Sequence, residues 1–102
     1  MLGGKKTRTI SQPVSQTAAE IPANTITIKN FSFDPSVLTV KKGTTVTWIN
    51  NDSASHKIKS DSFNSENLNQ GGKFTFTFSN TGKFDYICSI HPSMKGTIVV
   101  NE

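Results

Sequence analysis

The chain has 102 residues, a formal net charge of +4 and a single cysteine, so it can form one domain but not two. One cysteine excludes an intramolecular disulfide and every site that needs two thiolates, including paired-cysteine zinc sites and iron–sulfur clusters. The charge is divided evenly between residues 1–20 and the rest, which is not the basic cluster that nucleic-acid binding requires, and no apolar run is long enough to span a membrane.

Residues 1–21 are rich in Ser, Thr, Gln, Gly and Lys and contain no aromatic residue, which predicts a flexible tail or linker. They carry basic residues but lack the apolar stretch of a signal peptide, so export would require a leader or anchor that has been removed. All nine aromatic residues lie between Phe31 and Tyr86. The folded domain is therefore predicted to comprise residues 22–102.

Within residues 22–102 the apolar and β-branched positions recur with a period of two, which is typical of strands. Turn signals rich in Gly, Pro, Asn and Asp separate the strand-like runs. The alternating phenylalanines of residues 74–78 are interpreted as a core-facing strand, and the polar residues 60–70 as a long loop or distorted strand. Six to eight short strands without a convincing helix predict an all-β sandwich or small barrel. The predicted strands cover residues 25–28, 37–40, 44–49, 74–78, 83–87 and 96–100.

Cys88, His91 and Met94 form a C-x2-H-x2-M motif in the loop expected between the last two strands. A thiolate and an imidazole at this spacing can converge on one ion, and the thioether can approach as a weaker ligand. His56 follows a turn at the end of a predicted strand, and a sandwich could place it beside that loop. Two histidines, one cysteine and an axial methionine are the donor set of blue-copper electron-transfer sites.

From residue 24 to the C-terminus the sequence resembles the cupredoxins, the small blue copper proteins, of the plastocyanin and amicyanin type. The resemblance rests on residues 33–35, 40–52 and 86–94, with His56, Gly96 and residues 99–100, and the short C-x2-H-P-x-M loop is most similar to amicyanin. It implies a Greek-key β-sandwich of two sheets that holds one copper ion near one end. The ligands that it implies are His56, Cys88 and His91 in the equatorial positions and Met94 in the axial position.

The resemblance also implies a one-electron carrier and not an enzyme, because four protein ligands leave no open position for a substrate. His91 is the expected electron port, with redox proteins docking transiently against a patch that includes Ile90, Pro92 and the stem of Lys95. We expect a monomer without a nucleic-acid partner. A lone thiolate and copper suit a periplasmic or extracellular-facing location, with tethering through a removed N-terminal segment left open.

Lys57 departs from the plastocyanin-type pattern, in which Asn commonly follows the first ligand histidine. The resemblance implies that the backbone N–H of Lys57 still bonds to the Cys88 sulfur. Because Lys replaces Asn, the side-chain bond to the hydroxyl of Ser89 is not expected, which bears on the rigidity and the redox potential of the site and not on the ligation.

Other interpretations remain open at this stage. Taken singly, the cysteine could be a small buried hydrophobe, the methionine a core residue and His56 a surface histidine. A copper storage or delivery module would use the same four ligands. The lysines and strand phenylalanines would also fit a β-barrel that binds single-stranded nucleic acid. A cysteine–histidine nucleophile is disfavoured because no oxyanion site or third orienting group can be identified.

Overall fold

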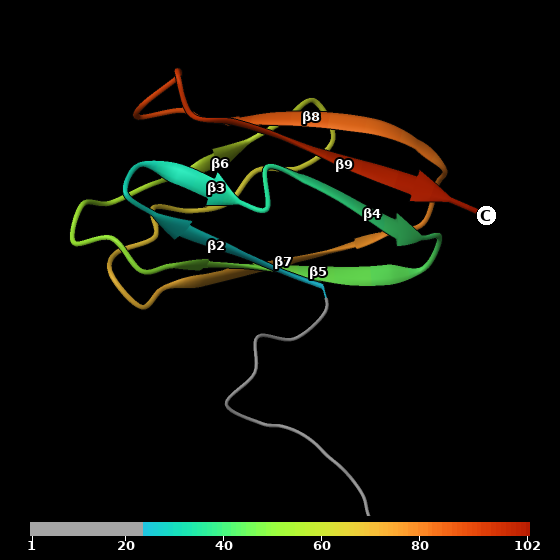
Figure 1. Cartoon of the computed structure of the whole chain (residues 1–102), viewed down its shortest axis with the longest axis horizontal. Helices are drawn as coiled ribbons and strands as arrows, with labels where there is room; N and C mark the ends of the chain where they lie inside the picture. The colour runs from blue at the N-terminus through green and yellow to red at the C-terminus, as the bar shows by residue number, and fades with distance from the viewer. Residues whose placement is uncertain (1–23) are drawn as a thin grey trace, which may run out of the picture.

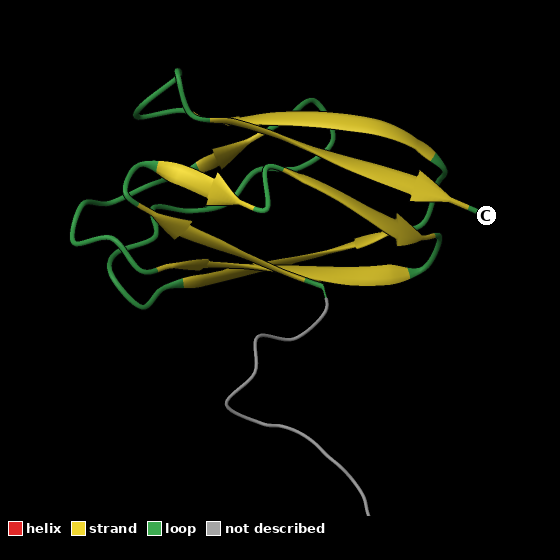
Figure 2. Cartoon of the chain, in the orientation of Figure 1, coloured by secondary structure: helices red, strands yellow, loops and turns green. Residues whose placement is uncertain are grey.

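The structure is a computed structural model that describes residues 24–102, and these residues form eight strands and no helix (Figure 2). The predicted two-sheet all-β sandwich is confirmed, whereas the tail expected over residues 1–21 lies outside the described residues. No described element is a helix that could cross a membrane. The strands are β2 (Thr25–Lys29), β3 (Ser32–Asp34), β4 (Val37–Lys41), β5 (Thr44–Asn50), β6 (Ile58–Lys59), β7 (Lys73–Phe78), β8 (Gly82–Cys88) and β9 (Lys95–Asn101).

The two sheets have four strands each, in the orders β3-β2-β5-β7 and β4-β9-β8-β6, and they lie face to face (Figure 1). β2 pairs parallel to β5 and β4 pairs parallel to β9, while the other neighbours are antiparallel. All six strands predicted from the sequence are present, with ends shifted by one residue at most. β3 and β6 were not predicted, because strands of three and two residues are too short to show an alternation.

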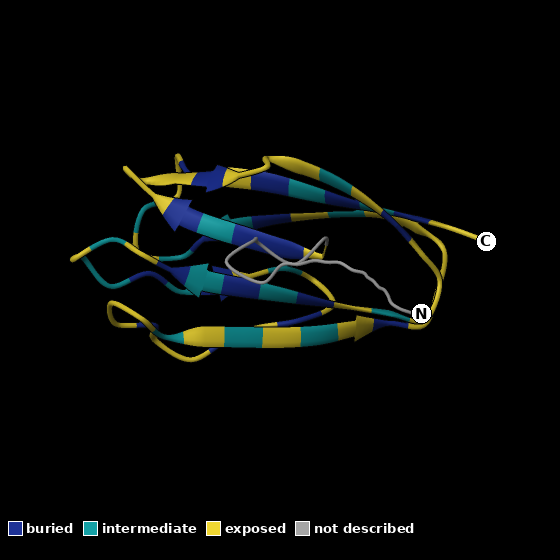
Figure 3. Cartoon of the chain, turned by 60° about the horizontal axis from the view of Figure 1, so that its bottom comes forward, coloured by how far each residue is buried: buried dark blue, intermediate teal, exposed yellow. Residues whose placement is uncertain are grey.

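The core lies between the sheets and is built from the inward positions of each strand, which alternate with outward ones (Figure 3). Phe78 is buried and Phe74 and Phe76 pack against the core, which confirms the core-facing interpretation of this strand. The same alternation directs Asn50 inward after Trp48 and Cys88 inward after Tyr86. Two polar or reactive side chains are therefore buried at the ends of β5 and β8.

Candidate metal centre

The loops that carry the predicted ligands gather at one end of the sandwich, on the left in Figure 1. β2, β5 and β8 end there, and β9 begins there. β6 pairs with β8 in the register Ile58↔Cys88, which brings the segment after β5 beside the last residue of β8. The sheet register thus brings His56 beside Cys88 across 32 positions of the sequence.

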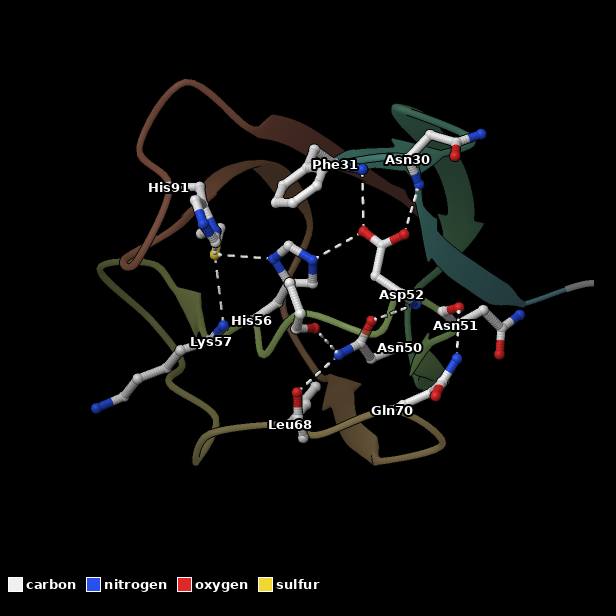
Figure 4. Close-up of polar contacts among 12 residues, drawn as sticks. Asn30, Phe31, Asn50, Asn51, Asp52, His56, Lys57, Leu68, Gln70 and His91 are labelled. Carbon is white, nitrogen blue, oxygen red and sulfur yellow. Dashed lines mark hydrogen bonds and ion pairs between the residues drawn. The ribbon is translucent and has the colours of Figure 1, made fainter.

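The donor atoms of three predicted ligands converge at this end (Figure 4). The Sγ atom of Cys88 lies 3.5 Å from Nδ1 of His56 and 3.9 Å from Nδ1 of His91. One ligand atom from each of the three residues lies within 4.8 Å of the other two. Cys88 and His56 are fully buried, whereas His91 is half-buried. The expectation that a sandwich places His56 beside the Cys88 loop is confirmed.

Backbone groups from the neighbouring segment hold Cys88 in place. The N–H of Lys57 donates to Sγ of Cys88 at 3.5 Å, and the N–H of Ser89 donates to the carbonyl oxygen of Lys57 at 2.9 Å. The first of these bonds confirms what the resemblance implied for the residue after His56. The two bonds fix the sulfur of Cys88 beside the segment that follows His56.

His56 is oriented by a carboxylate on its own loop. Its Nε2–H donates to Oδ2 of Asp52 at 2.9 Å, and this bond leaves the lone pair of Nδ1 directed at the Cys88 sulfur (Figure 4). Burial alone would raise the pKa of Asp52, but hydrogen bonds from the backbone of Phe31, from His56 and from the backbone of Asn30 outweigh it and lower that pKa. A ligand histidine whose other nitrogen is bonded to a carboxylate is typical of metal sites.

The loop before His56 is held by a buried side chain at the end of β5. The Nδ2 group of Asn50 donates to the carbonyl oxygens of Ala54 (2.9 Å) and Leu68 (2.7 Å), and its Oδ1 accepts the backbone N–H of Asp52 (2.8 Å). Leu68 also pairs with His56 through both of its backbone groups. The side chain of Asn50 therefore fixes the path of the chain from β5 to His56.

The loop after Cys88 is held by backbone bonds instead. The N–H of Cys88 donates to the carbonyl oxygen of Met94 at 3.1 Å, and the N–H of Met94 donates to that of His91 at 2.9 Å. These bonds close the loop at its base, where Met94 is only 4% exposed. The fourth predicted ligand thus lies buried at the foot of the loop that carries His91.

Phe31 covers the two histidines from the turn between β2 and β3. Its ring meets those of His56 and His91 edge-on, with centroid separations of 5.4 and 5.0 Å. No role was predicted from the sequence for Phe31 or Asp52. A carboxylate four residues before a ligand histidine was a usable signal for Asp52, whereas nothing local pointed to Phe31.

Comparison with known proteins identifies the family. The family described as "Cupredoxin-like domain" matches residues 6–100. The chain is a cupredoxin. It is 30% identical over 105 residues to amicyanin of Paracoccus versutus, covering 94% of this chain and 78% of that protein. It is 36% identical over 83 residues to plastocyanin of Scenedesmus fuscus, covering 67% of this chain and 85% of that protein.

Solved structures place this cupredoxin among the same relatives. A purple cupredoxin from Nitrosopumilus maritimus superimposes with a TM-score of 0.72 at 34% identity, covering 76% of this chain and 98% of that one. A reduced Cu(I) form of an amicyanin variant gives a TM-score of 0.74 at 29% identity, covering 81% and 88%. The resemblance inferred from the sequence is confirmed.

The donor chemistry of this cupredoxin fits the copper ion that its family binds. One thiolate sulfur and two imidazole nitrogens form a His2Cys set, and the chain supplies a buried thioether in the adjoining loop. The bond between His56 and Asp52 supports this fit independently, because in the neutral ring it places the hydrogen on Nε2 and leaves Nδ1 free to bind a metal. Copper is therefore the cofactor of this domain.

Proposed function

We propose that this cupredoxin is a one-electron carrier that shuttles electrons between redox partners through a mononuclear blue (type 1) copper centre. The proposal assigns His56, Cys88 and His91 as equatorial ligands and Met94 as the axial ligand. Bound there, copper would supply one-electron transfer between its Cu(I) and Cu(II) states. The observation that carries the proposal is the convergence of the Cys88 sulfur and two Nδ1 atoms within 4.8 Å at a buried end of the sandwich.

The residues around these donors are arranged to hold one geometry. Lys57 holds the sulfur, Asp52 orients His56, and the loop from Cys88 to Met94 is closed by its own backbone. Ligands that are fixed before the metal binds have little to rearrange when its charge changes, so the barrier to electron transfer is small. With four protein donors, no ligand position remains for a substrate, which supports a carrier over an enzyme.

His91 is proposed as the electron port, because it is the only one of the three clustered donors that is not fully buried. Exposed apolar residues lie next to it: the Phe31 ring contacts the ring of His91 and is 52% exposed, and the chain neighbours of His91, Ile90 (43% exposed) and Pro92, are exposed. We propose that redox proteins dock transiently on this patch, with the cupredoxin acting as a monomer. We further propose a periplasmic or extracellular-facing location, which suits a copper ion beside an unpaired thiol.

A copper storage or delivery module would use the same ligands but would need easy metal release. A donor cluster with two fully buried members and a carboxylate-bonded histidine does not favour such release. The amicyanin and plastocyanin relatives also support the carrier over the storage alternative.

Titration of the apo-protein with Cu(II) tests the proposal. One equivalent should produce an intense thiolate-to-copper absorption in the visible range, and Cys88→Ser should abolish it while leaving the circular dichroism of the fold unchanged. Voltammetry of the loaded protein should give a reversible one-electron wave. A colourless one-to-one mixture would refute the copper centre, and rapid transfer of copper to a weak chelator would favour storage or delivery.

A further inference from the structure

The turn between β2 and β3 has an unusual backbone. β2 and β3 form a hairpin in which Lys29 pairs with Ser32, so Asn30 and Phe31 alone make the connection. Both have a positive φ, 55° for Asn30 and 57° for Phe31. Two-residue turns of this kind favour Asn followed by Gly, because a side chain at positive φ is crowded by its own backbone. A bulky residue is strained in this conformation.

One carboxylate holds this turn in place from a distant part of the chain. The N–H of Asn30 donates to Oδ1 of Asp52 at 2.6 Å, and the N–H of Phe31 donates to Oδ2 at 2.9 Å (Figure 4). Hydrogen bonds to an ionised acceptor are stronger than those between neutral groups. The same Oδ2 atom accepts the Nε2–H of His56, so Asp52 joins the strained turn to the first proposed ligand.

The strained conformation places the Phe31 ring against both histidines. It lies edge-on to His56 and to His91, with interplanar angles of 83° and 84°, while the two histidine rings are 5.1 Å apart. About half of the Phe31 surface faces solvent, since the residue is 52% exposed. The ring therefore forms the outer layer over the two histidine edges, and Asp52 sits behind it with a side chain only 11% exposed.

On the basis of the proposed copper site, we propose that Phe31 is a lid over His56 and His91 and that Asp52 is its positioning residue. The carboxylate that orients His56 also fixes the turn, so the ligand and its cover are set by one group. The lid keeps water and small chelators from the histidine edges and slows the loss of copper. Phe31 is retained at a position where the backbone favours glycine because its ring is needed there.

Phe31→Gly separates the lid from the stability of the turn. The variant creates the Asn-Gly pair that this turn favours, so the apo-protein should unfold at nearly the same urea concentration as the wild type. Loss of two edge-on ring contacts should nevertheless speed Cu(II) transfer to EDTA about tenfold. The decay of the thiolate–copper absorption measures the rate of this transfer. Phe31→Tyr keeps the ring and should restore the wild-type rate. Val37→Gly removes another exposed apolar side chain, on β4, and serves as the control.

Asp52→Asn tests the positioning role. Asn retains one acceptor oxygen and cannot satisfy three donors, so copper transfer to EDTA should accelerate by a similar factor. Asp61→Asn removes the same charge from an exposed residue and should leave the rate unchanged. In the double variant with Phe31→Gly, Asp52→Asn should accelerate copper transfer much less than it does alone. The ring that Asp52 positions is already absent from that variant.

The outcomes separate this inference from the proposed function. If the wild type forms no thiolate–copper band, the copper centre itself is wrong. If the band forms but Phe31→Gly releases copper at the wild-type rate, the lid is wrong and the centre stands. If the effects of Asp52→Asn and Phe31→Gly on the logarithm of the rate are fully additive, Asp52 acts on His56 alone and does not position the ring.

Discussion

His56 and His91 each place Nδ1 near the Sγ atom of Cys88, but the surroundings of the two rings differ. His56 is fully buried, its Nε2–H is bonded to Asp52, and its backbone pairs with Leu68. His91 is half-buried, and within residues 24–102 the structure gives its Nε2 no hydrogen bond. His56 is thus held in place by the surrounding structure, whereas His91 is partly exposed to solvent.

The two loops that carry these histidines differ in the same way. The loop from β5 to His56 depends on side chains, above all the buried amide of Asn50 and the carboxylate of Asp52. The loop from Cys88 to Met94 depends on backbone bonds that any sequence could make. Substitutions should therefore be costly in the first loop and mild in the second, except at the proposed ligands.

The largest difference between the two histidines should appear when each is replaced by glycine and imidazole is added to restore copper binding. In His91→Gly the lost ring leaves an opening at a half-exposed position, so added imidazole should enter and restore the thiolate–copper absorption. In His56→Gly the gap is buried and the Asp52 carboxylate loses one of its three donors, so imidazole should not restore the band. Copper titrations with and without imidazole measure the difference.

Circular dichroism of both apo-variants is the control for these titrations. If imidazole restored the band equally in the two variants, His56 would be as accessible as His91, and the proposed division between scaffold and port would be wrong.

Asn50→Ala should give the next largest effect. It leaves the carbonyl oxygen of Ala54 without its donor, removes one of the two donors to the carbonyl oxygen of Leu68, and removes the acceptor for the N–H of Asp52. Because buried polar groups without partners are costly, the free energy of unfolding should fall by about 3 kcal/mol. Urea unfolding of the apo-protein measures it, with the exposed Asn80→Ala as the matched control. A loss no greater than that of the control would contradict the role given to Asn50.

The same contrast explains what the sequence could predict. The six longer strands follow from a local alternation, and Cys88, His91 and Met94 stand out because such residues are rare in this chain and closely spaced. Local patterns also predicted a long loop or distorted strand over residues 60–70, although not its bridges from Leu68 to His56 and from Asn64 to Lys59.

Asp52 and Phe31 could not be found in this way. Asp52 reaches Asn30 and Phe31 across 22 and 21 residues, and these contacts exist only because β2 lies parallel to β5 in one register. From the sequence alone, Asp52 is one of several turn residues after a strand and Phe31 is one of nine aromatic residues. Such roles are set by tertiary pairing, which a period of two does not specify.

Met94→Leu should have a moderate effect that is confined to the redox potential. Leucine preserves the buried volume, so the fold and the colour should persist. Removal of a weak donor that favours Cu(II) should raise the potential by tens of millivolts, as measured by voltammetry. Loss of copper binding in this variant would show that the axial assignment is wrong.

The smallest difference in stability should be that between variants of two serines near the histidines, Ser55 and Ser93. Oγ of Ser55 donates to Oδ1 of Asn69 at 2.7 Å, so Ser55→Ala should lower the free energy of unfolding by about 0.5–1 kcal/mol. Ser93 is exposed in the backbone-supported loop, so Ser93→Ala should stay within about 0.5 kcal/mol of the wild type. Urea unfolding of the two apo-variants under identical conditions measures the difference. A larger loss for Ser93→Ala than for Ser55→Ala would mean that side chains support the second loop as well, and the difference between the two loops would then reduce to the burial of their histidines.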